Sequence, residues 1–323
     1  MFVHMIVRMI GGLFSLCILL SLSLPATAAP DGVHVFVLHS YSQEYPWTKR
    51  QHEGFVDALG AGHATELTIE TEYLDTKRHA FTHDYAAKFA DYLRFKYADF
   101  APQLIYVSDD NALDFALEHL GELFPGIPLF FSGVNDYSVP QRFAGRMVTG
   151  VFEKKEIAPN LNLLAAMGRE SGEIVIVGDA SGTYRAIERE IKAELQGYPA
   201  TRARFVASGH IDEILDGLRK YPEGDLFLTT LGRVQANGTQ TLSLRETIRR
   251  IVAIRPRVVI SMEDGYVFDG VLGGFVTSGV RQGAAAAGLA GRFLAGEGMP
   301  PAITKSPNEY LIDARQLLGH SLR

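Results

Sequence analysis

The chain has 323 residues, of which 47% are hydrophobic and 21% are charged, and its formal net charge is −6. This composition excludes a chain that stays disordered for lack of apolar residues, and the length favours two lobes over a single hydrophobic core. The acidic charge makes a nucleic-acid-binding protein a poor candidate, because such proteins bind largely through basic patches.

The first 28 residues are predicted to be a signal peptide. Arg8 is their only full charge, residues 9–24 form an apolar run, and Ala26-Thr27-Ala28 supplies the small residues that precede a cleavage site. The mature chain then starts at Ala29, lies in the periplasm, and has a net charge of −7 because Arg8 is lost from the total of −6. An uncleaved membrane anchor is the alternative, although the run is short for a bilayer span of about 20 residues.

The single cysteine, Cys17, lies inside this leader. Leu16 precedes it, whereas lipoprotein processing needs a small residue there, so we do not expect lipidation. The mature chain has no cysteine, which excludes disulfides and thiolate metal sites.

Apolar runs alternate with longer amphipathic stretches in the first half of the chain, which predicts a parallel sheet with right-handed helical crossovers. The predicted strands are Val33–Leu38, Leu67–Tyr73, Leu104–Val107 and Pro128–Phe131, and the predicted helices are Arg50–Leu59, Asp84–Tyr97 and Ala112–Leu123.

The same order restarts in the second half and predicts a second parallel sheet. Its predicted strands are Ile174–Val177, Ala203–Ala207, Leu226–Thr229 and Val258–Ser261, and its predicted helices are Ile157–Met167, Ala186–Leu195, Ile211–Tyr221 and Ser243–Ala253. The tail adds the Gly-rich Gly270–Gly274, a helix over Arg281–Ala295 and a strand over Glu309–Ile312.

These elements predict an α/β fold of two Rossmann-like lobes joined by a three-strand hinge. We assign residues 29–149 and 271–300 to lobe 1, and residues 150–270 and 301–323 to lobe 2, with crossings near Thr149, Gly270 and Pro300. Three such connections would let the lobes close around a ligand.

Polar and aromatic side chains follow the predicted strands at their carboxyl ends, where ligands bind in open parallel sheets. The lobe 1 candidates for ligand binding are Ser40, Tyr41, Trp47, Asp109, Asn111, Asn135 and Asp136. The lobe 2 candidates are Asp179, Tyr184, Thr230 and Asp264. Their joint position predicts one cleft between the lobes, and their several acids favour a ligand that carries an amine.

Each candidate also has a structural interpretation. Ser108, Asp109 and Asp110 are the residue types that cap a following helix, because a Ser or Asp oxygen accepts the free N–H groups of a first turn. Trp47 either packs on its lobe behind Pro46 or stacks on an organic ligand. We expect ligand contact from the set as a whole more than from any single member.

Motifs for catalysis are missing from the sequence. No Walker loop, GxGxxG fingerprint or GxSxG elbow follows a predicted strand, and the ten histidines include no HExxH pair. Adjacent His39 and Ser40 would point to opposite faces of a strand, which argues against a Ser–His pair. We therefore expect no enzyme, no cofactor and no metal site, and we interpret His39, His79 and His210 as surface or packing residues.

Several stretches carry a family resemblance that spans nearly the whole mature chain. They are Val37–Thr48, Pro102–Phe115, Phe124–Asp136, Thr149–Ile157, Asp225–Arg233 and Gly270–Val276. Through them the sequence resembles the extracytoplasmic solute-binding proteins of the ABC-type substrate-binding family, whose close relatives are sensor domains of membrane histidine kinases and diguanylate cyclases.

The resemblance implies a type I periplasmic binding fold that holds a small organic ligand, amino-acid-like or aromatic, between two lobes. The partner of a transport protein would be a membrane permease, and the partner of a sensor domain would be a membrane-bound kinase or cyclase. The sequence stops at Arg323 with no second membrane span, which favours a binding protein over a sensor unless the chain is a fragment.

Overall fold

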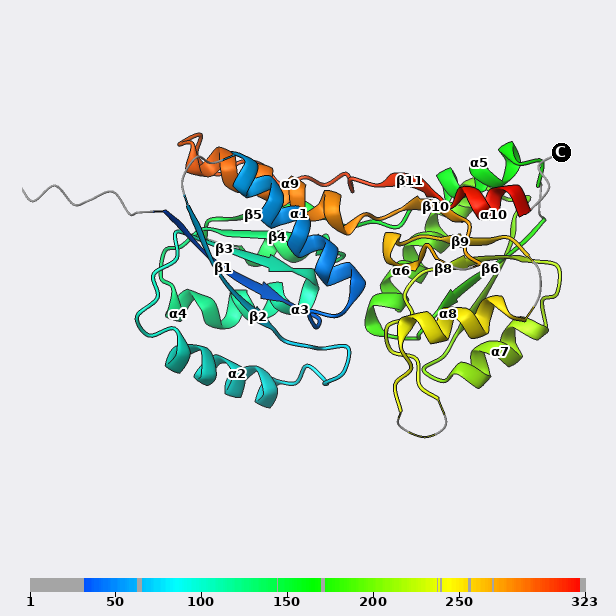
Figure 1. Cartoon of the computed structure of the whole chain (residues 1–323), viewed down its shortest axis with the longest axis horizontal. Helices are drawn as coiled ribbons and strands as arrows, with labels where there is room; N and C mark the ends of the chain where they lie inside the picture. Colours follow the sequence, from blue (N-terminus) through cyan, green and yellow to red (C-terminus); the bar gives the residue numbers. More distant parts are fainter. Residues whose placement is uncertain are drawn as a thin grey trace, which may run out of the picture. The chain divides into compact units, whose positions relative to one another are not determined.

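Two β-sheets with helices on both faces form the framework of the protein (Figure 1). The structure is a computed structural model, and it describes residues 32–62, 66–143, 145–169, 172–236, 238, 240–254, 257–268 and 270–319. Gly32–Arg323 clusters as one compact unit that contains both sheets. The predicted signal peptide and its cleavage site lie outside the described residues.

The first sheet has five parallel strands in the order β2-β1-β3-β4-β5. The strands are β1 (Val33–His39), β2 (Leu67–Tyr73), β3 (Leu104–Ser108), β4 (Leu129–Val134) and β5 (Val148–Phe152). Successive side chains of a strand point to opposite faces, so Phe36 and Leu38 enter one core and Val35 and Val37 the other. Both faces are buried, which explains why these strands read as continuous apolar runs.

Helices α1 (Pro46–Gly62) and α9 (Gly279–Leu294) cover one face of this sheet, although more than 200 residues separate them. They lie side by side (Figure 1). A Cβ on Gly283 would lie 2.0 Å from the carbonyl oxygen of Gln51, and one on Gly54 would lie 2.2 Å from that of Val280. Glycine at both positions therefore permits the close approach of the two backbones.

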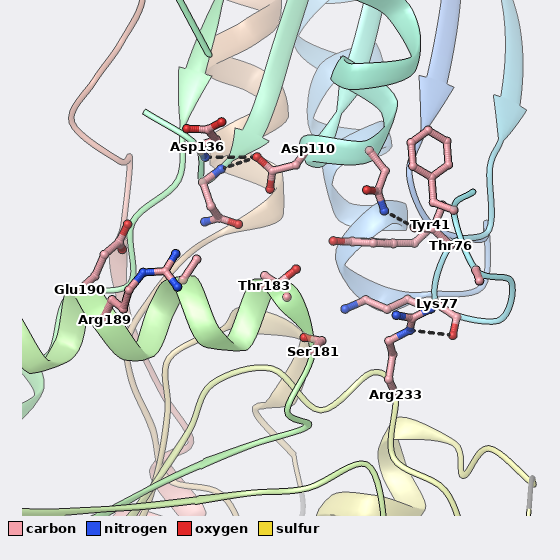
Figure 2. A pocket seen from close by; sticks show the side chains of 16 residues that line it. Tyr41, Thr76, Lys77, Asp110, Asp136, Ser181, Thr183, Arg189, Glu190 and Arg233 are labelled. Atoms are coloured by element: carbon pink, nitrogen blue, oxygen red, sulfur yellow. Dashed lines mark hydrogen bonds between the residues drawn. The ribbon is translucent and has the colours of Figure 1, made fainter. Parts of the chain in front are cut away.

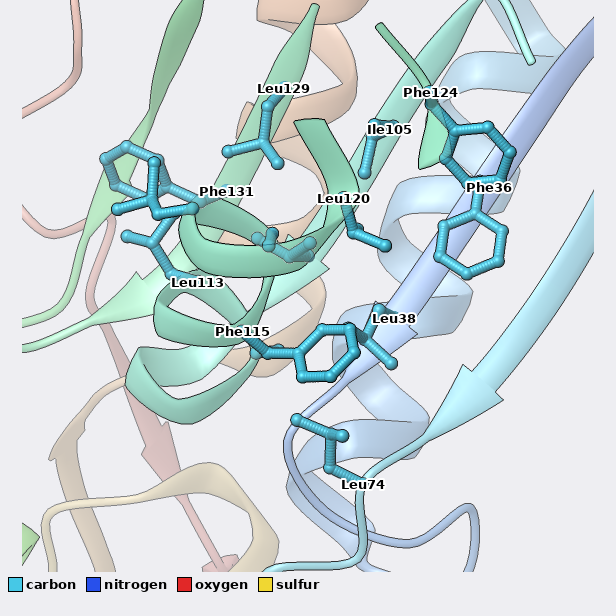
Figure 3. Packing of buried hydrophobic residues seen from close by; sticks show 14 of the residues in the cluster. Phe36, Leu38, Leu74, Ile105, Leu113, Phe115, Leu120, Phe124, Leu129 and Phe131 are labelled. Carbon is cyan, nitrogen blue, oxygen red and sulfur yellow. The ribbon is translucent and has the colours of Figure 1, made fainter. Parts of the chain in front are cut away.

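The opposite face of the first sheet is covered by α2 (His83–Lys96) and α3 (Asp109–Phe115), which continues into a π-helical turn (Ala116–Leu120) and the short α4 (Gly121–Leu123). Figure 3 shows this core, in which Leu113 and Phe115 of α3 meet Leu38 and Phe131 of the sheet. The sequence predicted one helix over Ala112–Leu123; the π-helical turn that interrupts it has no signal in the sequence.

The second sheet has six strands in the order β11-β10-β9-β8-β6-β7, and only β11 runs antiparallel to its neighbour. Its strands are β6 (Glu173–Gly178), β7 (Arg202–Ala207), β8 (Asp225–Leu228), β9 (Val259–Ser261), β10 (Gly273–Val276) and β11 (Glu309–Ile312). Its helices are α5 (Ala158–Ala166), α6 (Gly182–Glu194), α7 (Ile211–Arg219), α8 (Leu244–Val252) and α10 (Ala314–Gly319).

The chain passes between the two sheets at residues 153–157, 277–278 and 304–308. The predicted lobe boundaries need correction at all three passages. Residues 150–152 were assigned to lobe 2, but they belong to β5 and pair with β4 of the first sheet. Residues 273–276 were assigned to lobe 1, but Gly273 pairs with Ile260 in the second sheet. Ile303 was assigned to lobe 2, but it forms a bridge with Val151 of the first sheet. Backbone pairing, which a single sequence does not reveal, fixes all three boundaries.

Most predicted strands and helices are confirmed to within a few residues. Strands β5 and β10 were not predicted as strands, because each is short and contains glycine, and only pairing with a neighbour identifies it. Across the described part of the chain, no helix has both the length and the apolar character that a membrane crossing requires.

Candidate functional site

A cavity of about 600 Å³ lies where the carboxyl ends of the two sheets face each other (Figure 2). We call it the main cavity. The first lobe lines it with residues that follow β1, β2, β3 and β4, and the second lobe with α6 and the loop after β8. Its polar and aromatic lining residues include Tyr41, Thr76, Lys77, Asp110, Asn111, Asn135, Asp136, Ser181, Thr183, Arg189, Glu190 and Arg233.

A second cavity of only about 20 Å³ shares Tyr41, Lys77, Asn135 and Thr183 with the main cavity. We call it the inner cavity, and we call the residues that line it the cleft floor. The remaining lining residues include Tyr45, Trp47, Asp109, Glu153, Lys155, Thr230 and Glu263. The two cavities therefore form one polar site with a wide mouth and a narrow base.

Lys77 places a positive charge at the junction of the two cavities. Its Nζ lies 4.5 Å from the ring centroid of Tyr41 and 5.5 Å from that of Tyr45, so two aromatic faces stabilise the ammonium group. Arg233 of the second lobe donates a hydrogen bond from Nε to the Lys77 carbonyl oxygen across 3.4 Å (Figure 2). Two cations from different lobes thus face the same space.

Asp110 fixes the loop that follows β4. Its Oδ1 accepts hydrogen bonds from the backbone N–H groups of Asn135 and Asp136, each at 3.1 Å. Burial raises the pKa of Asp110 to about 7; the charge of Glu153 adds to the rise and the backbone N–H groups oppose it. The bonds hold Asn135 at the cavity wall, where its side chain also donates to the Glu153 carbonyl oxygen at 3.3 Å.

Trp47 and Asp109 form a buried pair on the cleft floor. The Trp47 indole Nε1 donates to Asp109 Oδ1 at 2.8 Å, and each residue is only 3% exposed. Lys155 Nζ lies 5.7 Å from the centroid of the indole ring. These contacts favour the packing interpretation of Trp47. Asp109 has a φ of 67°, a left-handed conformation that Asp tolerates better than most residues and that is often found at functional sites.

A buried charge cluster joins the hinge to the second lobe. Lys155 Nζ lies 2.6 Å from Glu153 Oε1 and 3.4 Å from Glu263 Oε2, and it donates to Thr277 Oγ1 at 3.1 Å. Burial lowers the pKa of Lys155, but the two carboxylates outweigh burial and raise the pKa above its ordinary value. Burial raises the pKa of Glu263 to about 7, against the opposing charge of Lys155.

Four predicted site residues lie outside the residues that line the two cavities. Ser40 Oγ donates to the Ser108 carbonyl oxygen and accepts the Ala112 N–H, both at 2.8 Å, so it caps α3. Asp179 accepts the N–H groups of Ser181 and Arg233, both at 3.1 Å. Their oxygens already have backbone partners, so the capping interpretation applies to them.

Tyr184 and Asp264 complete this group. Tyr184 is 2% exposed and packs under β6, where a Cβ on Gly178 would lie 1.9 Å from its ring. Asp264 lies 3.3 Å from Arg50 and accepts the Gly279 N–H at 2.9 Å, so it connects α1 to the start of α9. The other predicted residues line one or both cavities: Tyr41, Trp47, Asp109, Asn111, Asn135, Asp136 and Thr230.

Sequence reasoning missed the cations of the site. Lys77 follows β2 and Arg233 follows β8, so the strand-end rule that selected Asp109 and Asn135 would also have selected them. Arg189 and Glu190 lie a full turn or more into α6, and nothing in the sequence indicates that this side of the helix faces the first lobe.

No protein-family model and no curated protein matches the sequence. Solved structures match along nearly the whole chain. One is the ABC domain from Streptococcus pneumonia in complex with L-Trp: it is 14% identical, the match covers 89% of this chain and 94% of the other, and the TM-score is 0.63. Another is a ligand-free, open substrate-binding protein with adhesive properties from Clostridium difficile, with 15% identity, coverage of 90% and 95%, and a TM-score of 0.62.

A third is the periplasmic ribose ABC transporter protein from Conexibacter woesei, with 14% identity, coverage of 90% and 96%, and a TM-score of 0.56. At such identities the likeness establishes the fold alone. The chain has the type I periplasmic binding fold, with two α/β lobes, and the fold that the resemblance implied is confirmed.

Proposed function

We propose that the chain is an extracytoplasmic solute-binding protein that captures a small organic ligand between its lobes and presents it to the permease of an ABC transporter. The observation that carries this proposal is the main cavity, whose walls come from both lobes and whose volume of about 600 Å³ is typical of small-molecule sites. Structures with the same fold include one with bound L-Trp and one with bound tagatopyranose.

Two of the bonds that join the lobes among the described residues lie beside the cavities. Arg233 reaches the Lys77 carbonyl oxygen at 3.4 Å, and the hydroxyl groups of Tyr45 and Tyr266 lie 3.3 Å apart. A neutral hydrogen bond such as that of the tyrosine pair adds only about 1 kcal/mol of net stability, and the bond from Arg233 is long and exposed, so both contacts can break and re-form during opening. A ligand that binds both walls would shift the equilibrium toward the closed form.

The walls favour a polar ligand with unlike charges. Lys77 and Arg233 suit a carboxylate, Asp110 and Asp136 suit an amine, and the Tyr41 ring offers a flat apolar surface. Amino acids and related compounds are therefore the first candidates. Burying the charged groups of such a ligand would be favourable only where the cavity wall supplies partners for them, because an unpaired buried polar group costs roughly 1–3 kcal/mol.

A thermal-shift screen of the chain from Ala29 to Arg323 against amino acids, nucleosides, purines and sugars tests the proposal. A ligand present at 100 times its Kd adds about 2.7 kcal/mol of stability and raises the Tm. Small-angle scattering with the active compound should show a smaller radius of gyration. Deletion of the gene should abolish uptake of that compound. A protein that no compound stabilises, or whose loss leaves uptake unchanged, would contradict the proposal.

A further inference from the structure

A chain of hydrogen bonds crosses the first lobe from α1 to the cleft floor. His52 Nδ1 lies 3.0 Å from His39 Nε2, His39 Nδ1 lies 2.8 Å from Ser108 Oγ, and Ser108 Oγ lies 3.0 Å from Asp109 Oδ2. His52 is partly exposed on α1, whereas His39 and Ser108 are fully buried. This series of hydrogen bonds therefore connects solvent outside the cleft with the Asp109 carboxyl group inside it.

The donors and acceptors along this chain allow two consistent arrangements. A neutral imidazole has one N–H group and one free lone pair, and both ring nitrogens of His39 are engaged. If Asp109 is ionised, His52 donates to His39, His39 donates to Ser108, and Ser108 donates to Asp109. If Asp109 is protonated, every bond reverses its direction. In both arrangements each bond has one donor and His39 stays neutral.

The burial of His39 supports a neutral imidazole in both arrangements. Burial lowers the pKa of His39 well below its ordinary value, and the neighbouring His52 lowers it further, so the imidazole carries no charge at neutral pH. The rings of Tyr73 and Tyr106 lie 5.3 Å and 6.0 Å from it, centroid to centroid, and exclude water. A buried neutral imidazole with two partners transfers a proton by changing its tautomer.

The charges near Asp109 favour its protonated form. Burial raises the pKa of Asp109 well above its ordinary value, the charges of Glu153 and Asp110 act in the same direction, and the bonds from Trp47 and Ser108 oppose them. The titratable and charged groups around Asp109 are Tyr41, Tyr45, Lys77, Tyr106, Asp110, Glu153, Lys155 and Glu263. Those around His39 are His52, Tyr73 and Tyr106, and those near His52 are Glu53 and Asp57.

We propose that Ser108 and His39 relay a proton between His52 on the surface of α1 and Asp109 on the cleft floor. When Asp109 is protonated, one proton moves along each bond from His52 Nδ1 to Asp109 Oδ2, and His52 Nε2 takes a replacement proton from solvent; the reverse returns it. Asp109 then changes its charge with pH even while the lobes are closed, and the inner cavity presents either a carboxylate or a neutral carboxyl group to its contents. The relay itself belongs to the ligand-free protein; its effect on ligand capture rests on the proposed function.

The single tryptophan makes the relay observable, because Trp47 donates its indole N–H to Asp109. The ligand-free protein, labelled with ¹⁵N, is titrated from about pH 9 down to about pH 3, a range that spans the ordinary pKa values of Asp and His. As pH falls, the Trp47 indole resonance should shift, and the ¹⁵N signals of His39 should change from the Nδ1–H to the Nε2–H tautomer at the same midpoint. His39 signals that never interchange, or that interchange at a different midpoint, would overturn the proposal.

Three variants sharpen the test. Ser108→Ala interrupts the relay, so the Trp47 resonance should still titrate while His39 keeps one tautomer; an unchanged, coincident interchange would contradict the relay. Asp109→Asn removes the carboxyl group, so the pH-dependent changes of the Trp47 and His39 signals at their common midpoint should disappear. If both signals still change at that midpoint, Asp109 is not the titrating group. His83→Gln, an exposed substitution at the start of α2, should leave both signals as in the parent protein. Because no ligand is present, the result stands whether or not the chain is a transport protein.

Discussion

The hydroxyl oxygens of Tyr45 and Tyr266 lie 3.3 Å apart, and this bond joins the loop before α1 in the first lobe to the second lobe. The Tyr266 hydroxyl also accepts the backbone N–H of Leu231 at 3.0 Å, whereas the Tyr45 hydroxyl has no second hydrogen-bond partner among the described residues. The two tyrosines therefore serve different purposes, and replacing each by phenylalanine separates them.

Tyr45→Phe should weaken closure and leave the fold intact. It removes one neutral hydrogen bond between the lobes, so the free energy of unfolding should change by less than about 1 kcal/mol. Tyr266→Phe removes the same bond and also leaves the buried Leu231 N–H unpaired, which should cost roughly 1–3 kcal/mol. Urea unfolding measures the difference, and scattering should show that Tyr45→Phe expands the ligand-free protein. Equal unfolding free energies for the two variants would contradict this division.

Lys155→Met should be among the most destabilising single changes in the cleft. It leaves Glu153 and Glu263 buried without their cation, and removing one partner of a buried ion pair costs about 3–5 kcal/mol. The triple variant that adds Glu153→Gln and Glu263→Gln should regain part of the loss, because neutral amides need no counter-charge. Chemical denaturation checks both, with Lys88→Met on the exposed side of α2 as the control. A triple variant as unstable as the single one would argue against the charge explanation.

Glu263 should make the protein less stable as pH rises from about 4 to about 7. Its pKa is near 7 in the folded protein and near 4.3 in the unfolded chain, so between these values the folded state binds more protons. The free energy of unfolding then falls with rising pH, by an amount on the order of a few kcal/mol across the window, and does so no further above pH 7. Glu263→Gln should flatten this part of the curve of unfolding free energy against pH, whereas the exposed Glu122→Gln should leave it unchanged. An unaltered slope in Glu263→Gln would assign the effect to other groups, such as Asp110.

Lys77→Met and Arg233→Gln should each reduce the thermal stabilisation that a ligand found in the screen provides. Hydrogen bonds to charged groups are worth about 1.5–3 kcal/mol, which corresponds to a loss of roughly tenfold to a hundredfold in affinity. Asn135→Ala should also weaken binding, because its amide faces both cavities. Lys88→Met, at an exposed residue that lines neither cavity, serves again as the control. Undiminished affinity in all three variants would place the ligand elsewhere.

The sequence predicted the framework well because periodicity and strand-end chemistry are local properties. Val35, Phe36, Val37 and Leu38 form a buried strand for reasons visible in their side chains alone. Local sequence patterns cannot distinguish a helix cap from a ligand contact. Ser40 and Asn135 both follow strands, yet the Ser40 hydroxyl caps α3 whereas Asn135 lines the main cavity. That distinction depends on where the partner backbone lies.

The cleft floor depended even more on long-range structure. Lys155 meets Glu263 across more than 100 residues, and the sequence analysis selected neither. His39 was interpreted as a surface or packing residue, and the structure buries it completely. Its partners Ser108 and His52 come from another strand and a helix, and no spacing rule connects them. Asp264 also follows a strand and was expected in the cleft, but it pairs with Arg50 and lies outside the lining of both cavities, so its contact with a ligand stays a prediction.

The interleaved path of the chain affects how the protein can be made. α9 seals the apolar side of α1 and is followed by Ile303 on the first sheet and by β11 on the second, so neither lobe is a continuous stretch of chain. Neither lobe can finish folding until nearly all residues have left the ribosome. If the predicted signal peptide directs the chain to a secretion channel, late completion would keep the nascent chain unfolded, and so competent for translocation, until its last segments are synthesised.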